Sequence, residues 1–154
     1  LKTAFLFSCL TGLRKSDVKA FSWEMIQPEA DGTLYITTRM QKTKQIVHNP
    51  IGEEALALID SDSRMGLVFP GFKDSMTQTA LKQWIKAAGI TKNITYHSSR
   101  HTYCTLQLEA GTDSRTVQEL VGHKNLATTQ CYLDSVSSRK KEAANRITLK
   151  RKVE

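Results

Sequence analysis

Two histidines and an arginine stand close together in the stretch "TYHSSRHTYCTLQLEAG", residues 95–111. If this stretch is helical, His97 and Arg100 project from nearly the same face, and His101 lies one turn after His97. Two kinds of site can use such groups. The histidines can be ligands of a metal ion, or the imidazoles and the guanidinium together can donate hydrogen bonds to a phosphate. Chance proximity is the third interpretation.

Further reactive side chains stand at places in the sequence where helices and a hairpin are predicted to end. Arg14 comes just after a glycine that stops a helix, and Lys42 lies on the tip of a hairpin. His123 directly follows another glycine stop, and Tyr132 comes nine residues later. No acidic cluster that would bind magnesium accompanies them. The set of two guanidiniums, an ammonium and imidazoles is therefore typical of a cradle for phosphate.

The elements that must position these groups are mostly helices. Apolar spacing and glycine stops predict helices, and the last of them begins at Asn125 and carries Tyr132. The predicted helices cover residues 3–12, 14–23, 53–59, 75–90, 95–111, 113–123 and 125–135. Alternating residues predict one β-hairpin over 32–51. The predicted fold is mainly α with a small antiparallel β-sheet, in a single domain.

Several local expectations follow from the same patterns. Ser16 is the predicted N-cap of the second helix, and Asp113 that of the sixth. Ile46 is expected to face the core from the hairpin. Leu106 and Ala110 are expected to continue the core face of the helix that starts near His97. His101 is expected to be a core histidine or to support a catalytic group rather than to be a catalyst itself, and Tyr96 and Tyr103 to be packing residues rather than nucleophiles.

The composition bounds the kind of protein. At 154 residues, with 40% hydrophobic and 24% charged residues, the chain suits one globular domain. The net charge of +7 points to a polyanionic partner. Residues 139–154, "RKKEAANRITLKRKVE", hold seven Lys/Arg and two Glu, so a basic tail supplies most of this excess. No apolar run is long enough to cross a bilayer.

Three blocks of the sequence together resemble a known family. The blocks "TGLRKSD", "HSSRHT" and "VGHKNLATTQCY" resemble the signature blocks of the catalytic domain of tyrosine recombinases, also called the phage integrase family. Their order and spacing agree with the family over residues 1 to about 140, and a hairpin lysine lies between the first two. The departures are slight: Val121 stands where leucine is commoner, and Asp17 where the family often has glutamate.

The resemblance implies a role for each residue that matches a block. Tyr132 would be the nucleophile that forms a 3′-phosphotyrosyl bond with DNA. Arg14 and Arg100 would bind the scissile phosphate, and His123 would donate a further hydrogen bond. His97 would act as an acid, a base or a phosphate ligand, with no metal or other cofactor.

Two further roles fall on lysines. Lys42 would be the general acid that protonates the departing 5′ oxygen, with Lys44 as the alternative. Lys44 and Lys124 are also candidate DNA contacts.

Elementary chemistry is consistent with these roles. Free tyrosine has a pKa near 10, so about one phenol in a thousand is ionised at neutral pH and a base or nearby cations must assist it. Each fixed donor to the phosphate oxygens contributes about 3–4 kcal/mol if it acts like a donor in an oxyanion hole. The phosphotyrosyl ester retains the bond energy, so resealing needs no ATP.

Three alternatives compete with this interpretation. A zinc site would use His97 and His101, with His123 or Cys131 as a third ligand, but it leaves the arginines and Lys42 without a role. A non-catalytic DNA-binding module on the same fold is the second. A nicking and closing enzyme related to type IB topoisomerases, which share the chemistry, is the third.

The resemblance also implies a cellular setting. The chain is expected to be the catalytic domain of a bacterial integrase from a mobile element, with residues 1–135 as the core and 136–154 as a basic tail. An N-terminal core-binding domain would precede it in the full protein. The expected partners are double-stranded DNA, three further copies in a tetramer on DNA, and accessory DNA-bending proteins. The protein would be cytoplasmic, associated with the nucleoid when bound to DNA, and not membrane-bound.

Overall fold

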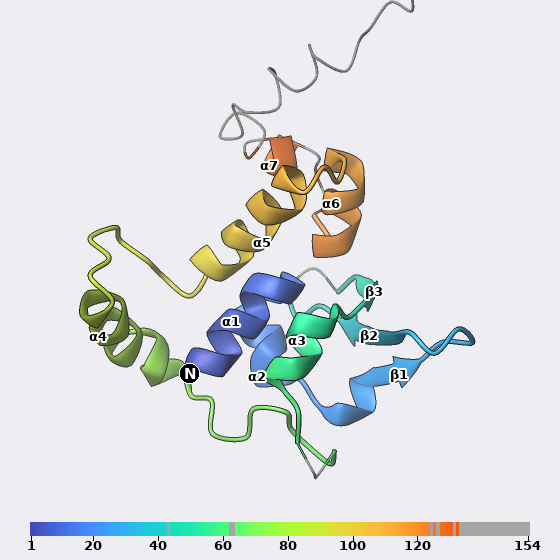
Figure 1. Ribbon diagram of the computed structural model, residues 1–154, viewed down its shortest axis with the longest axis horizontal. Coiled ribbons are helices and arrows are strands. Elements are labelled where there is room, and N and C mark those ends of the chain that lie inside the picture. Colours follow the sequence, from blue (N-terminus) through green and yellow to red (C-terminus); the bar gives the residue numbers. More distant parts are fainter. Residues whose placement is uncertain (43, 62–63, 124, 126, 131, 133–154) are drawn as a thin grey trace, which may run out of the picture.

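The computed structural model describes residues 1–42, 44–61, 64–123, 125, 127–130 and 132. Helix α1 (Lys2–Thr11) lies at the centre of the described part (Figure 1). It packs against α3 (Glu53–Leu58) on the side of the β-sheet and against α5 (Ser98–Glu109) on the other. The fold is mainly α with a small antiparallel sheet, as the sequence predicts.

The first helix ends where the glycine stop predicts. Gly12 adopts the left-handed conformation with φ 69°, and its N–H donates to the Ser8 carbonyl. Helix α2 (Lys15–Lys19) follows with Arg14 as its N-cap, because Arg14 is extended at φ −74° and ψ 158°. The prediction of Ser16 as N-cap is therefore wrong: Ser16 is already inside the helix. The helix is also shorter than the predicted 14–23.

The sheet has three strands where the sequence predicts two. Its order is β1 (Ile26–Pro28), β2 (Leu34–Arg39) and β3 (Ile46–Pro50), all antiparallel. Strand β1 is too short to show an alternating pattern, and it follows a single 3₁₀ turn, η1 (Trp23–Met25). Pairing with β2, rather than local sequence, keeps it extended.

Strand β3 faces the core with a different residue from the one predicted. Ile46 is 74% exposed, and Val47 is buried opposite Thr38. The hairpin turn fixes this register, because the Met40 N–H donates to the Gln45 carbonyl and pairs Arg39 with Ile46. A shift of one residue exchanges the two faces of a strand, which is why the prediction for Ile46 is wrong.

The second half of the chain is helical. The predicted helix 75–90 divides into a 3₁₀ turn, η2 (Asp74–Thr77), and α4 (Thr79–Ala87). Helix α6 (Ser114–Val121) begins at the predicted cap Asp113, whose carboxylate accepts from the N–H groups of Arg115 and Thr116. It ends at Gly122, which is left-handed at φ 58°. Helix α7 (Ala127–Gln130) is a single turn.

Helix α5 is rotated relative to the prediction. Leu106 is 46% exposed and Ala110 is also exposed, so the expectation that they face the core is wrong. The inward face is instead made by Arg100, Cys104 and Leu108, four residues apart, with Tyr103 beside them. This rotation directs Arg100 into the interior of the protein.

The buried apolar residues form two clusters that meet near α1 and α5. The larger surrounds α1, the sheet, α3 and α4, and the smaller joins α5 to α6 and includes half-buried Tyr132. Tyr96 and Tyr103 are buried, as predicted. Within the described ranges, no helix has the length and apolar character needed to cross a membrane.

Candidate active site

Arg100 lies at the centre of the candidate site and is 1% exposed. Its Nη1 donates to the Gly12 carbonyl at 2.7 Å, and its Nη2 donates to the Val121 carbonyl. Among the described residues, its Nε has no hydrogen-bond partner. Burial, and then the charge of Arg14, lower the pKa of Arg100 to about 10. Arg100 therefore remains a cation at neutral pH, and its Nε is a buried donor that no described group satisfies.

Arg14 is held beside this centre by the turn between α1 and α2. Its Nη1 donates to the thioether sulfur of Met40, at the base of the hairpin turn. Arg14 is half-buried, and its charge acts on Arg100, His97 and His123, lowering the pKa of each. The two arginines that the sequence assigns to one phosphate are thus neighbours.

A positively charged hollow of about 550 Å³ opens next to Arg14. Its lining joins α2, the hairpin tip, α4 and the start of α5, and includes Arg14, Lys15, Lys42, Lys82, Tyr96 and His97. The described side chains that line it include no carboxylate. Such a hollow favours an anionic ligand.

Asp17 positions the hairpin tip. This buried carboxylate accepts a hydrogen bond from the Gln41 N–H at 2.9 Å, directly before Lys42. Its other oxygen, Oδ2, has no hydrogen-bond partner in the described part of the chain. Sequence patterns assign Asp17 no functional role, although its place three residues after Arg14 is a signal that points to one.

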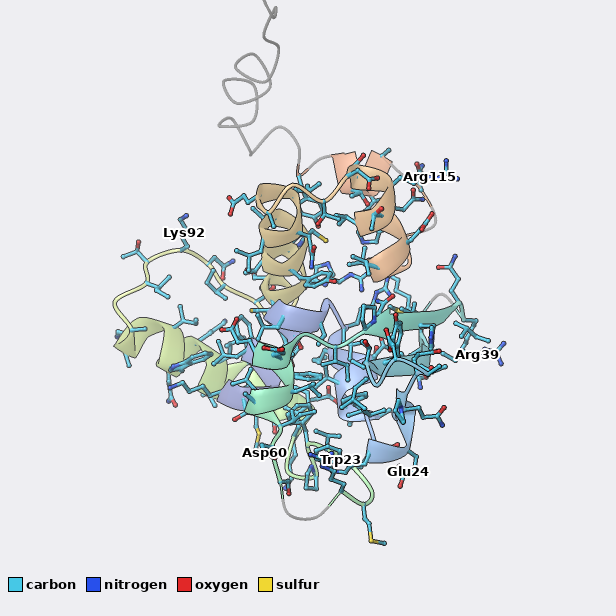
Figure 2. The ribbon with its side chains drawn as sticks, turned by 45° about the vertical axis from the view of Figure 1, so that its right-hand side comes forward. Trp23, Glu24, Arg39, Asp60, Lys92 and Arg115 are labelled. Carbon is cyan, nitrogen blue, oxygen red and sulfur yellow. The ribbon has the colours of Figure 1, made fainter. Side chains whose placement is uncertain are left out.

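The two hairpin lysines lie in different surroundings. Lys42 lines the hollow with Arg14 and His97, and its charge is among the causes that lower the pKa of His97. Lys44, exposed like Lys42, has a positive φ of 59°, and its carbonyl accepts a hydrogen bond from Arg39. The side chain of Arg39 extends away from the body of the protein (Figure 2). The geometry favours Lys42 over Lys44, and Lys124 lies outside the described residues.

His123 follows the left-handed glycine that ends α6. Its Nδ1 is 2.9 Å from the hydroxyl of Thr129, a fully buried residue of α7, and its carbonyl accepts from Gln118 Nε2 at 3.0 Å. Burial, and then the charges of Arg100 and Arg14, lower the pKa of His123 to about 4. Thr129 is a second residue that sequence reasoning missed, although it lies in the third block.

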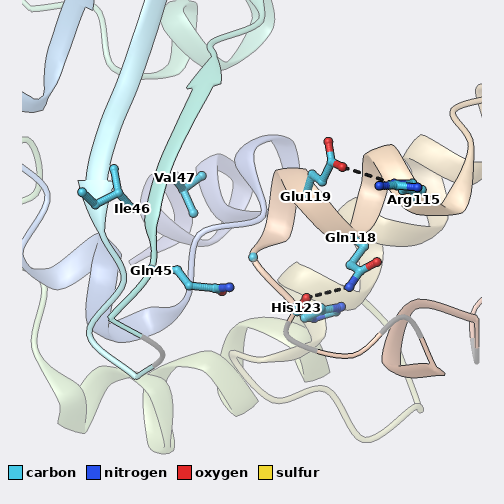
Figure 3. Close-up of a pocket in the computed structure, with 8 residues that line it drawn as sticks. Gln45, Ile46, Val47, Arg115, Gln118, Glu119 and His123 are labelled. Atoms are coloured by element: carbon cyan, nitrogen blue, oxygen red, sulfur yellow. Dashed lines mark hydrogen bonds and ion pairs between the residues drawn. The ribbon is translucent and has the colours of Figure 1, made fainter.

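A second hollow, of about 670 Å³, is lined in part by His123 (Figure 3). It is bounded by β3 and α6. Its described lining residues are Gln45, Ile46, Val47, Arg115, Gln118, Glu119, Gly122 and His123. Here the charges are mixed, because Arg115 pairs with Glu119 at 3.6 Å. It is less suited to an anion than the hollow beside Arg14.

Tyr132 and the two histidines of α5 complete the site. His97 is the N-cap of α5, and its ring lies 4.6 Å from that of His101, centroid to centroid. Burial, and then His101 and nearby cations, lower the pKa of His97. His101 is exposed, so the prediction of a core position is wrong. Its Nδ1 is hydrogen-bonded to the Tyr132 hydroxyl, so it contacts a candidate catalytic group, as the other half of that prediction allows.

The zinc alternative can be set against the same geometry. Within the described residues, no group of three or more His, Cys, Asp or Glu side chains is placed to hold a metal ion. Cys131, one suggested ligand, lies outside those residues. The imidazoles of His97 and His123 instead lie within electrostatic reach of Arg14 and Arg100. Nearby cations oppose the binding of Zn²⁺.

The chain is similar to proteins of one known family. A family model described as "Phage integrase family" matches residues 1–139. The chain is 33% identical over 135 residues to the tyrosine recombinase XerD of Lacticaseibacillus casei, covering 79% of this chain and 46% of that protein. It is 33% identical over 137 residues to the tyrosine recombinase XerC of Brucella melitensis, covering 82% of this chain and 43% of that protein.

Solved structures show the same fold. The post-cleavage complex of the XerH site-specific recombinase with palindromic difH substrate has a TM-score of 0.72 and 19% identity, covering 93% of this chain and 44% of that one. The catalytic domain of bacteriophage HP1 integrase has a TM-score of 0.67 and 21% identity, covering 93% of this chain and 79% of that one. The chain spans about half the length or less of the curated relatives it matches.

Proposed function

Because the chain belongs to the phage integrase family, we propose that it catalyses site-specific DNA recombination through a 3′-phosphotyrosyl intermediate, without metal or ATP. One observation carries the proposal. A buried guanidinium, Arg100, has a second guanidinium, an imidazole and a phenol within electrostatic reach, from four separate segments of the chain. These groups are Arg14, Arg100, His123 and Tyr132.

The phosphate would be bound by the two arginines and the third-block histidine. Arg14 supplies charged donors at the hollow, and the buried cation of Arg100 adds positive charge behind it. If the Thr129 hydroxyl donates to Nδ1 of His123, the Nε2 of that ring carries the proton and can donate to a phosphate oxygen. Fixed donors of this kind stabilise the charge that develops on the phosphate oxygens during attack.

The proton for the leaving group would come from the hairpin. Lys42 lines the same hollow as Arg14 and His97, so a 5′ oxygen bound there can be reached by its ammonium group. Asp17 holds the backbone next to Lys42 through the Gln41 N–H. His97, which lines the same hollow, would support the phosphate or exchange protons.

Double-stranded DNA is the proposed partner. The XerH structures are complexes with difH substrate, and the Tn1549 transposon integrase is described in complex with circular intermediate DNA. The hollow lined by Arg14, Lys15, Lys42 and Lys82 suits a phosphate backbone. The transposon and phage relatives support a mobile element as the source.

In the full-length protein we propose a tetramer on DNA, assisted by accessory DNA-bending proteins, in a cytoplasmic, nucleoid-associated setting. The division into a core of residues 1–135 and a basic tail of 136–154 stays a prediction, and the tail lies outside the described residues.

A covalent adduct with DNA tests the function. The 154-residue chain is incubated with a pool of nicked duplexes randomised around the nick, so that a cleaved strand end diffuses away and the adduct accumulates. We expect an adduct whose DNA-bearing peptide contains Tyr132. The variant Tyr132→Phe should form none while binding the same DNA. An adduct on another residue, or none with the unaltered chain, would contradict the proposal.

A further inference from the structure

His101 makes a contact that the catalytic roles given above do not use. Its Nδ1 is hydrogen-bonded to the hydroxyl of Tyr132, although the two residues are 31 apart in the sequence. The two ring centroids are 5.4 Å apart, and the rings are tilted by 52°. His101 is exposed in the first turns of α5, where packing alone does not require an imidazole.

A general base must lie within hydrogen-bond reach of the proton that it removes. His101 Nδ1 meets this condition for the phenolic proton of Tyr132. His97, one turn earlier, instead lines the hollow with Arg14 and Lys42. Resting on the proposed function, we propose that His101 is the general base that activates Tyr132 for attack on DNA.

The proton and the bonds then balance without any further reactant. The phenolic proton moves from Tyr132 Oη to His101 Nδ1 as Oη forms its bond to phosphorus. The bond from phosphorus to the 5′ oxygen breaks, and that oxygen takes a proton from the general acid, proposed to be Lys42. In resealing, the imidazolium of His101 returns its proton to the departing phenolate.

The surroundings tolerate the positive charge that His101 gains. Because it is exposed, water solvates the imidazolium through Nε2–H. The titratable groups facing it are His97 on its own helix, His123 after α6, and Tyr132 itself. Arg100, its neighbour in the sequence, is a permanent cation, and the charge of Asp17 acts on it in the opposite direction. The anionic phosphate would add compensation during attack.

Adduct formation on the nicked duplexes provides the kinetic test. We expect His101→Ala and His101→Asn to slow it by about 100-fold, a modest loss for a general base, with DNA affinity unchanged. Asparagine can keep a hydrogen bond to the phenol but cannot take its proton. The matched control is His48→Ala, an exposed histidine that contacts Thr37 and Glu29 on the sheet and should leave the rate unchanged.

Fluorinated tyrosine at position 132 separates base catalysis from positioning. A more acidic phenol needs less help in losing its proton. With this nucleophile, His101→Ala should therefore slow adduct formation by less than tenfold. A purely structural contact would give the same loss with either nucleophile. If His101→Ala slows adduct formation equally with tyrosine and with fluorinated tyrosine, or if His101→Asn is fully active, the proposal is overturned and the proposed function still stands. Failure of the unaltered chain to form any adduct would instead overturn both.

The tautomer of His101 gives a second test that needs no DNA. Nitrogen-15 NMR of the 154-residue chain should show His101 with the proton on Nε2 and a bare Nδ1, and Tyr132→Phe should shift the Nδ1 resonance. A proton on Nδ1 of the neutral ring, or no response to Tyr132→Phe, would overturn the assignment.

Discussion

The guanidinium of Arg100 donates to the carbonyl of Gly12 at 2.7 Å and to that of Val121, so one buried side chain joins the C-terminal ends of α1 and α6. Helix ends leave carbonyls without partners, and a cation there also interacts favourably with the helix dipole. The residue assigned to the phosphate is thus also a structural link between the first and third blocks of the sequence.

Loss of Arg100 should therefore cost stability as well as activity. Arg100→Ala leaves two buried carbonyls without a donor, and each such group costs about 1–3 kcal/mol. We expect the free energy of unfolding in urea to fall by at least about 2 kcal/mol. Arg100→Lys should recover only part of this loss, because an ammonium group cannot reproduce the fork of donors.

Arg14 provides the matched comparison. It is half-buried and its side chain donates to the thioether of Met40, so Arg14→Ala should abolish adduct formation while changing stability by less than about 1 kcal/mol. Equal destabilisation by the two alanine variants would argue against a structural role specific to Arg100.

Gly12 should not tolerate a side chain. A Cβ at this position would lie 2.6 Å from Tyr103 Cδ1, and its φ of 69° is itself unfavourable for other residues. We expect Gly12→Ala to lower the free energy of unfolding by about 2–4 kcal/mol, from backbone strain and overpacking together. Gly111→Ala is the control: φ is 98° there, but nothing lies within 4 Å of the added Cβ. Its loss should reflect the backbone alone, about 1–2 kcal/mol.

Asp17 should affect catalysis through the hairpin. Asp17→Ala removes the acceptor that holds the Gln41 N–H, so the adjacent Lys42 loses its support. We expect adduct formation to slow by at least about tenfold, since misplacement by about 1 Å can cost 100-fold. Asp17→Asn keeps an oxygen acceptor and should retain more activity than Asp17→Ala. The reverse order would show that the negative charge, rather than the hydrogen bond, is what matters.

His123 should make stability depend on pH. Its pKa is lowered to about 4 in the folded state, whereas the pKa of an unfolded histidine is about 6.5. Between these values the unfolded state binds more protons, so stability is greatest above about pH 6.5 and falls as the pH drops towards 4. His97, whose pKa is also lowered, adds to this trend.

Thermal unfolding at several pH values checks this expectation. The Tm should decrease from pH 7 to pH 4.5, and His123→Gln should reduce the slope of Tm against pH in that window. A slope unchanged by His123→Gln would show that other groups cause the acid sensitivity.

The sequence predicts much of this fold because its stops and caps are local. Gly12, Gly122 and Asp113 end or begin helices as predicted, since the left-handed conformation and N-cap chemistry depend on few neighbours. Strand β1 and the exposure of Ile46 depend on pairing between strands, so a local pattern could not settle them. The inward turn of α5 is likewise decided by Arg100, a charged residue that a hydrophobic pattern assigns to the surface.

The candidate site was predictable to a similar degree. The residues in the three blocks gather around Arg100, which motif order alone could suggest. The supporting groups were not foreseen: Asp17 acts through a backbone N–H and Thr129 through a buried hydroxyl, and both depend on tertiary contacts. The exposed position of His101 and its contact with Tyr132 depend on where the end of the third block lies in space.

The two hairpin lysines can be told apart by changing the leaving group. Lys42 lines the hollow with Arg14, whereas Lys44 lies at the exposed turn with a positive φ. A 5′-thio leaving group departs as a thiolate and needs no proton, so a variant lacking the general acid should regain activity on that substrate. We expect Lys42→Ala to lose at least about 100-fold on the normal phosphodiester and to approach the unaltered chain on the thio substrate. Lys44→Ala should show little loss on either substrate, and rescue of Lys44→Ala instead would reassign the general acid to that residue.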